Sequence, residues 1–314
     1  MKRSHLAFVL AFVLRYALIS ALISALASSL ASTLASAPAS AATLQYQEVP
    51  KPVADSGASG QNIKAYYTPV QAALFAKQVE RSLATKSARL ALVFRAGRPR
   101  SQLRDGIAYT HGAIWVYGDI TGTDGKPYKG YAVYNLYQGD GRTLPIDQSY
   151  LAQDFPLDFI SGSQADDVGI IIPSPEMQKR ILMIVTSKTY QDLHIPSYSL
   201  VSNPYSGAYQ NCTGFLLDVV AAATWQTEDP VQIRANLKAN FHATRVHANL
   251  FERVLGPAIN KSLKMDDQSA QIETTTYESL SNFMVTNNLV QETYSLKRDN
   301  SERPQAESSF RPGP

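Results

Sequence analysis

Two strand-like runs joined by a short turn constrain the fold of this chain more than any other feature of its sequence. Residues 109–119 (YTHGAIWVYGD) and 131–138 (YAVYNLYQ) are rich in aromatic and β-branched side chains, which favour extended backbone. The segment between them contains Asp124-Gly125, a pair typical of tight hairpin turns. We therefore expect a β-hairpin here, and with it an antiparallel sheet.

Helix signals lie on both sides of this hairpin, so the predicted fold class is α+β. Thr68 followed by Pro69 has the pattern of a helix N-terminus, and Ser174 followed by Pro175 repeats it. An apolar run with helical spacing begins at Cys212. Taken together, the patterns predict helices over 70–88 and 175–187, from Cys212, from Pro230 and after Thr276, and strands over 88–97, 167–174 and 244–250.

The N-terminal segment has the pattern of a secretory signal peptide. Lys2 and Arg3 form a positive n-region, a long apolar run follows, and Ala39-Ser40-Ala41 supplies the small residues of a cleavage site. Cleavage after position 41 would place the mature protein in the periplasm. The length of the apolar run leaves an uncleaved inner-membrane anchor as the alternative, although Arg15 and the Ser-rich second half disfavour it. No second stretch is long and apolar enough to span a membrane.

Removal of such a signal makes the chain nearly neutral. The sequence has 29 Lys and Arg against 26 Asp and Glu, and Lys2, Arg3 and Arg15 lie in the signal. Without a basic stripe, nucleic acid is not an expected partner. The roughly 270 remaining residues suit one domain. The predicted organisation is a signal peptide over 1–41, a flexible segment over 42–65, a single domain with a C-terminal extension over 66–297, and a disordered tail over 298–314.

Cys212 is the only cysteine, and it lies where an irregular segment over 190–211 ends and a predicted helix begins. Buried free cysteines often serve as small apolar side chains, so a packed and inert thiol is one interpretation. An unpaired thiol is unusual in an oxidising compartment, however, and a helix N-terminus favours a thiolate. We therefore interpret Cys212 as a candidate nucleophile, with its own N–H and the neighbouring Gln210 and Asn211 as candidate oxyanion donors.

A thiol nucleophile requires a general base, and His111 is the best candidate in the sequence. It lies in the first predicted strand, where counting in twos puts it on the same face as Tyr109, a further candidate site residue. On the return strand, Asn135 is a polar residue in an aromatic and aliphatic run and is the candidate that orients the imidazole. A core histidine and a solvent-facing asparagine are the alternatives. We interpret His242 and His247 as surface residues.

The order of these residues resembles a known superfamily. A His on a strand (THGAIWV), a polar residue on the next strand (YNLY) and, later, NC at a helix start are similar to circularly permuted papain-like proteins, which include NlpC-type hydrolases and lecithin–retinol acyltransferase relatives. The resemblance implies a permuted papain-like core, in which the antiparallel sheet packs on the helix that begins at Cys212. It also implies that Cys212 is the nucleophile, His111 the base and Asn135 the third polar member.

A second resemblance covers most of the chain. The segments THGAIW, YSLVSNPYSGAYQNCTGFLLDVVAAA, ANLKANFHATRV and YESLSNFM are similar to an exported bacterial family catalogued as a domain of unknown function. This family brings no established activity. The link between the His strand and the Cys helix is longer than in the permuted papain-like proteins, so their substrates do not carry over.

The sequence thus predicts an exported thiol hydrolase or acyl-transferase that acts on an amide or ester in the cell envelope. A peptidoglycan stem peptide is the first candidate substrate, and an acyl lipid or lipoprotein is the second. A non-catalytic envelope binding module on the same fold is the alternative. Neither a metal nor an organic cofactor is expected, because the loop after Asp119 has Gly130 where an EF-hand requires Glu, and no zinc-binding spacing occurs. The oligomeric state is left open.

Overall fold

The computed structural model describes residues 65–104, 106–121, 125–247 and 260–299. These residues belong to one compact unit. The predicted signal peptide, nearly all of the predicted flexible segment and the tail from residue 300 onward lie outside the described residues.

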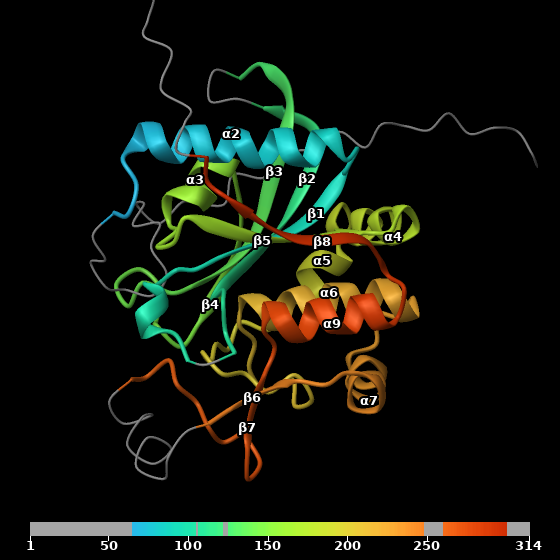
Figure 1. Ribbon diagram of the computed structural model, residues 1–314. Coiled ribbons are helices and arrows are strands. Elements are labelled where there is room, and N and C mark those ends of the chain that lie inside the picture. Colours follow the sequence, from blue (N-terminus) through green and yellow to red (C-terminus); the bar gives the residue numbers. More distant parts are fainter. Residues whose placement is uncertain (1–64, 105, 122–124, 248–259, 300–314) are drawn as a thin grey trace, which may run out of the picture. The chain divides into compact units, whose positions relative to one another are not determined.

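A six-stranded antiparallel sheet forms the centre of the described chain (Figure 1). Its strand order is β4-β3-β2-β1-β5-β8. The strands are β1 (Leu90–Arg95), β2 (His111–Thr121), β3 (Pro127–Gln138), β4 (Ser149–Asp154), β5 (Asp167–Pro173) and β8 (Val290–Lys297). β2 and β3 form the predicted hairpin. A separate two-stranded sheet pairs β6 (Thr244–Val246) with β7 (Ile272–Thr274).

Helices cover both faces of the six-stranded sheet (Figure 1). They are α2 (Pro69–Thr85), α3 (Pro156–Ser161), α4 (Pro175–Val185), α5 (Thr189–Asp192), α6 (Cys212–Trp225), α7 (Pro230–Asn240) and α9 (Tyr277–Thr286). α2 and α3 pack on one face, whereas α4, α6 and α9 pack on the other. This mixture of helices with an antiparallel sheet confirms the predicted α+β class.

β1 shows how the sequence builds two cores at once. Leu92 and Phe94 point into the cluster with α6, while Ala91 and Val93 point into the cluster with α2 and α3. Every residue of β1 is buried. A strand buried on both faces is apolar at successive positions rather than alternating, which explains the continuous apolar run in this part of the sequence.

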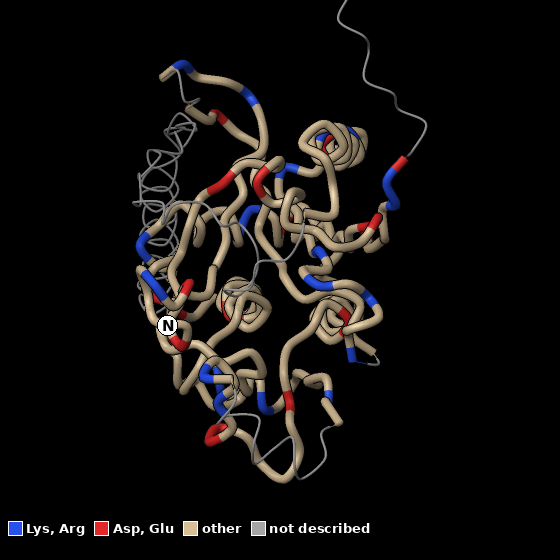
Figure 2. Tube along the Cα trace, turned by 90° about the vertical axis from the view of Figure 1, so that its left-hand side faces the viewer, with Lys and Arg blue, Asp and Glu red and all other residues tan. Residues whose placement is uncertain are grey.

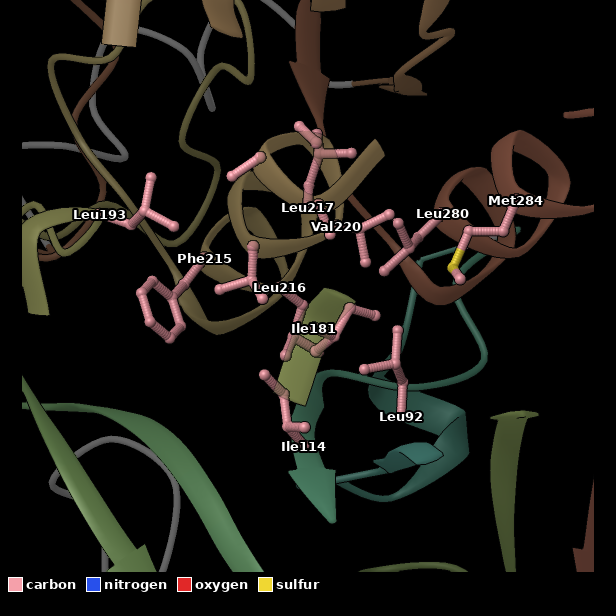
Figure 3. Close-up of a cluster of buried hydrophobic side chains, with 14 of the residues drawn as sticks. Leu92, Ile114, Ile181, Leu193, Phe215, Leu216, Leu217, Val220, Leu280 and Met284 are labelled. Carbon is pink, nitrogen blue, oxygen red and sulfur yellow. The ribbon is translucent and has the colours of Figure 1, made fainter. Parts of the chain in front are cut away.

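The larger core lies between the sheet and the α4, α6 and α9 layer. Figure 3 shows Leu92 and Ile114 of the sheet facing Ile181 of α4, Leu216 of α6 and Leu280 of α9. All five side chains are at most 1 % exposed. This packing fixes α6, and with it the position of Cys212, against the sheet.

Several elements differ from the sequence-based expectation. β4, α3 and β8 carried no clear pattern, because β4 and α3 are short and β8 is a half-exposed edge strand. The short helix α5 lies within the segment expected to be irregular. β2 begins at His111 rather than at 109, and the predicted strand over 244–250 is described only as β6, since positions from 248 lie outside the described residues.

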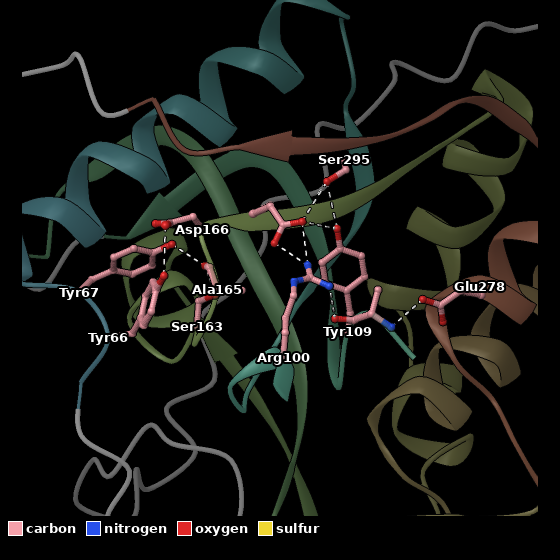
Figure 4. Close-up of polar contacts among 11 residues, drawn as sticks. Tyr66, Tyr67, Arg100, Tyr109, Ser163, Ala165, Asp166, Glu278 and Ser295 are labelled. Carbon is pink, nitrogen blue, oxygen red and sulfur yellow. Dashed lines mark hydrogen bonds and ion pairs between the residues drawn. The ribbon is translucent and has the colours of Figure 1, made fainter. Parts of the chain in front are cut away.

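A polar cluster ties β8 to β5 (Figure 4). Arg100 forms an ion pair with Asp167 at 2.6 Å, and the hydroxyl of Tyr109 lies 3.1 Å from both Asp167 and Ser295. Nearby, the hydroxyl of Tyr66 donates to Asp166 at 3.1 Å. The cluster joins the start of the described chain to its last strand.

Figure 2 shows positively and negatively charged residues interspersed along the described chain. Within the residues that the structure describes, the helices are too short or too polar to cross a membrane.

Candidate active site

Cys212 is the first residue of α6, and the turn before it holds the helix start in place. Asn211 is the N-cap: its Oδ1 accepts the N–H of Gly214 at 2.8 Å, and its Nδ2 donates to the carbonyl of Leu200 at 3.0 Å. The helix is buried from Cys212 through Ala223. A helix that is capped and buried in this way keeps its first residue fixed relative to the sheet.

Gln210 anchors the same turn with its whole amide group. Its Oε1 accepts the N–H of Ile195 at 2.9 Å, and its Nε2 donates to the carbonyl of Leu193 at 3.1 Å and to Asp218 at 2.7 Å. The structure thus commits the amides of both candidate oxyanion donors, Gln210 and Asn211, to holding the helix start.

The sheet opens beside Cys212. β1 and β2 stay paired up to Arg95 opposite His111, whereas the β2–β3 ladder ends at Ile114 opposite Tyr134. The start of β2 therefore has an edge that lacks its neighbouring strand, although β3 itself continues and pairs with β4. We call the β3-facing side of residues 111–113 the open edge of β2.

The sulfur of Cys212 lies against this open edge from the α6 side. The thiol donates to the carbonyl of Thr110 at 3.6 Å, and the N–H of Gly112 is close enough to lower the thiol pKa. The N–H of Gly112 points toward the side that β3 leaves unpaired, because the backbone groups of successive β2 residues alternate between β1 and β3. Gly112 is required here, since a Cβ would lie 2.6 Å from Phe94 and 2.7 Å from Leu216.

A buried polar network crosses the same opening on the α3 side. Nε2 of His111 lies 3.1 Å from Oδ1 of Asn135, and Nδ2 of Asn135 donates to Asp154 at 3.1 Å. The hydroxyl of Tyr137 donates to the same carboxylate oxygen at 2.6 Å. Asn135 is 0 % exposed, so the structure brings the two sequence-predicted partners together in the core. We call His111, Asn135 and Asp154 the His111 network.

The network fixes the proton on the imidazole. A carboxylate only accepts hydrogen bonds, so Asp154 orients the amide nitrogen of Asn135 toward itself and the amide oxygen toward His111. An amide oxygen accepts only, so Nε2 of His111 carries the proton. The other ring nitrogen, Nδ1, then holds a lone pair and is the nitrogen able to accept a proton.

His111 is neutral in this environment. Its ring stacks on Tyr137 with centroids 5.3 Å apart and an interplanar angle of 7°, and it lies 5.6 Å from the ring of Phe159. Burial, followed by the positive charge of Arg95, lowers the pKa of His111 to about 3, and the hydrogen bond to Asn135 opposes that shift only in part.

Cys212 is also neutral at rest. Burial raises the pKa of its thiol, while the N–H groups of Gly112, Thr213 and Cys212 itself and the charge of Arg95 oppose the rise. Within the described residues no hydrogen bond joins Cys212 to His111, since the thiol donates to Thr110 instead. The thiol lies on the α6 face of the sheet and the His111 network on the α3 face, and both the thiol and the imidazole are uncharged.

The first prediction concerns the thiol in the folded protein. A raised thiol pKa means that less thiolate is present at neutral pH, so we expect the rate of Cys212 alkylation by iodoacetamide to rise only above the range of an ordinary thiol, about 8.5. The same chain unfolded in urea is the control, and its rate should rise near that ordinary value. A rate that is already at its plateau below pH 7 would show a preformed thiolate instead.

The comparison with known proteins identifies the family. Residues 82–284 match the model of a family described as an uncharacterized protein conserved in bacteria (DUF2145). The chain belongs to this family. No curated protein and no solved structure matches the chain. The DUF2145 segment contains Cys212 and the whole His111 network, so the candidate site lies entirely within the family region.

Tyr109, the remaining candidate, lies outside the site. Its ring packs on Tyr277 of α9 and its hydroxyl belongs to the Asp167 cluster. The alternation that would place it beside His111 does not apply, because β2 begins only at His111 and the N–H of Thr110 already bonds to the carbonyl of Arg95.

Sequence reasoning missed three members of this part of the DUF2145 segment, namely Asp154, Tyr137 and Arg95. Asp154 ends a strand that had no recognisable pattern, and Tyr137 was one aromatic residue among many. A signal for Arg95 did exist, because it is the single charged residue in an apolar run. It is 0 % exposed, and its side chain packs over the ring of Phe159.

Two further findings bound the chemistry of the site. A surface cavity of about 380 Å³ lies at Tyr205, Phe241 and Arg245, and neither Cys212 nor His111 lines it. Within the described parts of the DUF2145 chain, no three His, Cys, Asp or Glu side chains gather closely enough to bind a metal ion.

Proposed function

We propose that this protein is a thiol-dependent hydrolase or acyl-transferase in which Cys212 attacks an ester or amide carbonyl. The observation that supports this function is that the start of β2 carries the hydrogen-bonded His111 network on the α3 face of the sheet, while the thiol of Cys212 contacts the neighbouring Thr110 from the α6 face. Asn135 and Asp154 hold the tautomer in which Nδ1 of His111 is the base.

The first step is a proton transfer coupled to attack. Because thiol and imidazole are both neutral at rest, the thiol proton moves to Nδ1 of His111 as the C–S bond forms, rather than beforehand. The leaving alcohol or amine then takes this proton as its bond to the carbonyl carbon breaks. Water hydrolyses the resulting thioester, or a second alcohol or amine accepts the acyl group, with His111 again as base.

Backbone N–H groups supply the oxyanion stabilisation in this proposal. The N–H groups of Cys212 and Thr213 are at the positive end of α6, and the N–H of Gly112 projects from the open edge of β2. Their position around the sulfur suits the oxygen of a carbonyl that the sulfur attacks. This assignment replaces the amides of Gln210 and Asn211, whose hydrogen bonds hold the turn.

The chain order supports a permuted papain-like core as part of the proposal. His111 lies on β2, Asn135 on the neighbouring β3 and Cys212 at the start of α6, which packs on that sheet. The signal-like N-terminus supports the periplasm as the compartment. An amide or ester of the cell envelope, such as a peptidoglycan stem peptide or an acyl lipid, is then the proposed substrate class.

Acylation by p-nitrophenyl acetate tests the function. We expect the folded full-length protein to release nitrophenolate faster than its urea-unfolded form and to carry an acetyl group on Cys212 by mass spectrometry. The Cys212→Ala variant should do neither. Acetylation that is slower in the folded than in the unfolded chain would overturn the proposal, because a thiol paired with a base gains reactivity on folding.

A second candidate function, a non-catalytic binding module of the envelope, is favoured by one observation. The thiol of Cys212 donates to the carbonyl of Thr110, as a packed and inert thiol does. The acetylation experiment separates the two functions: a binding module predicts a Cys212 that reacts only after unfolding.

A further inference from the structure

Arg95 is a buried cation beside the proposed nucleophile. It ends β1 directly opposite His111, and its side chain points to the α3 face, where the guanidinium lies 5.2 Å from the centre of the Phe159 ring. The ionisable groups near enough to act on its charge are Tyr137, Cys212 and Asp154. The guanidinium therefore lies next to the His111 network and within electrostatic reach of the sulfur.

The fold makes room for this guanidinium but leaves it short of partners. Gly162, just after α3, has no side chain, and a Cβ there would lie 1.8 Å from Nη1 of Arg95. Nε and Nη1 are both buried, and among the described residues neither has a hydrogen-bond partner. Buried donors without partners cost free energy, so their retention indicates a ligand that accepts their hydrogen bonds.

A second arginine, Arg98, follows β1 in the chain. Arg98 is partly buried and acts on the charge of Tyr198, which in turn lies near Cys212. Its side chain forms no ion pair with any described residue. Asp154 carries the opposite charge within electrostatic reach of Arg95, and its carboxylate accepts hydrogen bonds from Asn135 and Tyr137. The unpartnered donors of Arg95 are therefore the groups of this region that favour an anion.

We infer that Arg95 binds a carboxylate of the substrate beside Cys212, and that the substrate is an amide or ester whose acyl part carries a carboxylate close to the scissile carbonyl. The planar guanidinium presents two parallel N–H donors that match the two oxygens of a carboxylate. The part of the inference that concerns the reacting substrate rests on the proposed thiol chemistry. The binding of a carboxylate by Arg95 does not depend on it.

Two alkylating reagents of the same shape test the inference. Iodoacetate carries a carboxylate and iodoacetamide is its neutral analogue, so the ratio of their rates at Cys212 reports recognition of the negative charge. We expect this ratio to be about tenfold higher in the folded full-length protein than in the unfolded chain. In Arg95→Met the rate ratio should fall to that of the unfolded chain. In Arg95→Lys, which keeps the charge but not the two parallel N–H donors, the ratio should lie between the wild-type and the unfolded values.

Arg298→Met is the control, because Arg298 is a partly buried arginine that pairs with Asp166 outside the site. It should keep the wild-type ratio. A ratio that stays the same in both Arg95 variants would overturn the inference.

Thermal unfolding supplies a readout that does not need the thiol. Sodium acetate should raise the melting temperature of the wild type and of Arg298→Met above that in sodium chloride of equal ionic strength, and acetamide should not. This increment should vanish in Arg95→Met. If folded Cys212 reacts with neither reagent, the proposed thiol chemistry fails, and the rise in melting temperature with acetate alone decides the inference. Loss of this rise in Arg95→Met supports the carboxylate site. An equal rise in all three proteins overturns it.

Discussion

Replacement of His111 by alanine is expected to slow the acylation of Cys212 by about 10²–10⁴-fold, the range that a positioned general base contributes. The thiol is buried and protonated at rest, so it depends on a base that takes its proton during the attack. Nitrophenolate release from p-nitrophenyl acetate measures the rate. The effect should be on the acylation step rather than on substrate affinity.

Two controls separate catalysis from packing. His194→Ala removes another sheltered histidine, whose Nε2 lies 2.9 Å from the hydroxyl of Ser149, and should leave the rate near the wild-type value. Added imidazole should restore part of the rate in His111→Ala, because the small base enters the space that the ring leaves. Two results would contradict the assignment of His111 as base. One is a His111→Ala variant that keeps the wild-type rate, and the other is a folded His111→Ala variant whose lost rate added imidazole does not restore.

Asp218→Ala is expected to cause the largest loss of stability, about 3–5 kcal/mol, as breaking a buried ion pair does. Asp218 is 2 % exposed and accepts hydrogen bonds from Arg234 and Gln210. Its removal leaves the Arg234 charge without its anion. Chemical denaturation followed by circular dichroism measures the free energy of unfolding.

The matched control is an exposed ion pair. Asp192 pairs with Lys188 one helical turn away on α5, and their side chains are 51 % and 80 % exposed. Asp192→Ala should therefore cost less than about 1 kcal/mol. Equal losses of unfolding free energy in the two variants would contradict the large stabilisation expected from the buried pair of Asp218 and Arg234.

Because Gln210 also loses its partner in Asp218→Ala, the turn before Cys212 should loosen, and alkylation of the thiol should become faster in that variant.

The parts of the fold that the sequence encodes locally were predictable. The β2–β3 hairpin follows from two patterned runs and a turn between them, and the start of α6 follows from the change from an irregular segment to an apolar periodicity. The edge strands β4 and β8 were not, because a strand with one neighbour and partial exposure has little pattern of its own. Their positions depend on the strands they join.

The candidate site divides in the same way. Residue type and strand order suggested Cys212, His111 and Asn135, and the structure confirms the contact between the last two. Asp154 could not be foreseen, because its contact with Asn135 depends on the register that sets Val133 opposite Asp154. The partners of Gln210 and Tyr109 are likewise set by tertiary packing, which no local pattern records.

The open edge of β2 also determines when the thiol becomes sheltered. Thr110 and Cys212 are 102 residues apart in the sequence, so their contact forms only after α6 has docked on the hairpin. Until then the sulfur is accessible to oxidants and to thiol exchange with other chains. Afterwards the residue is only 6 % exposed. Completion of folding is thus a redox safeguard for a cysteine that has no second cysteine in its own chain.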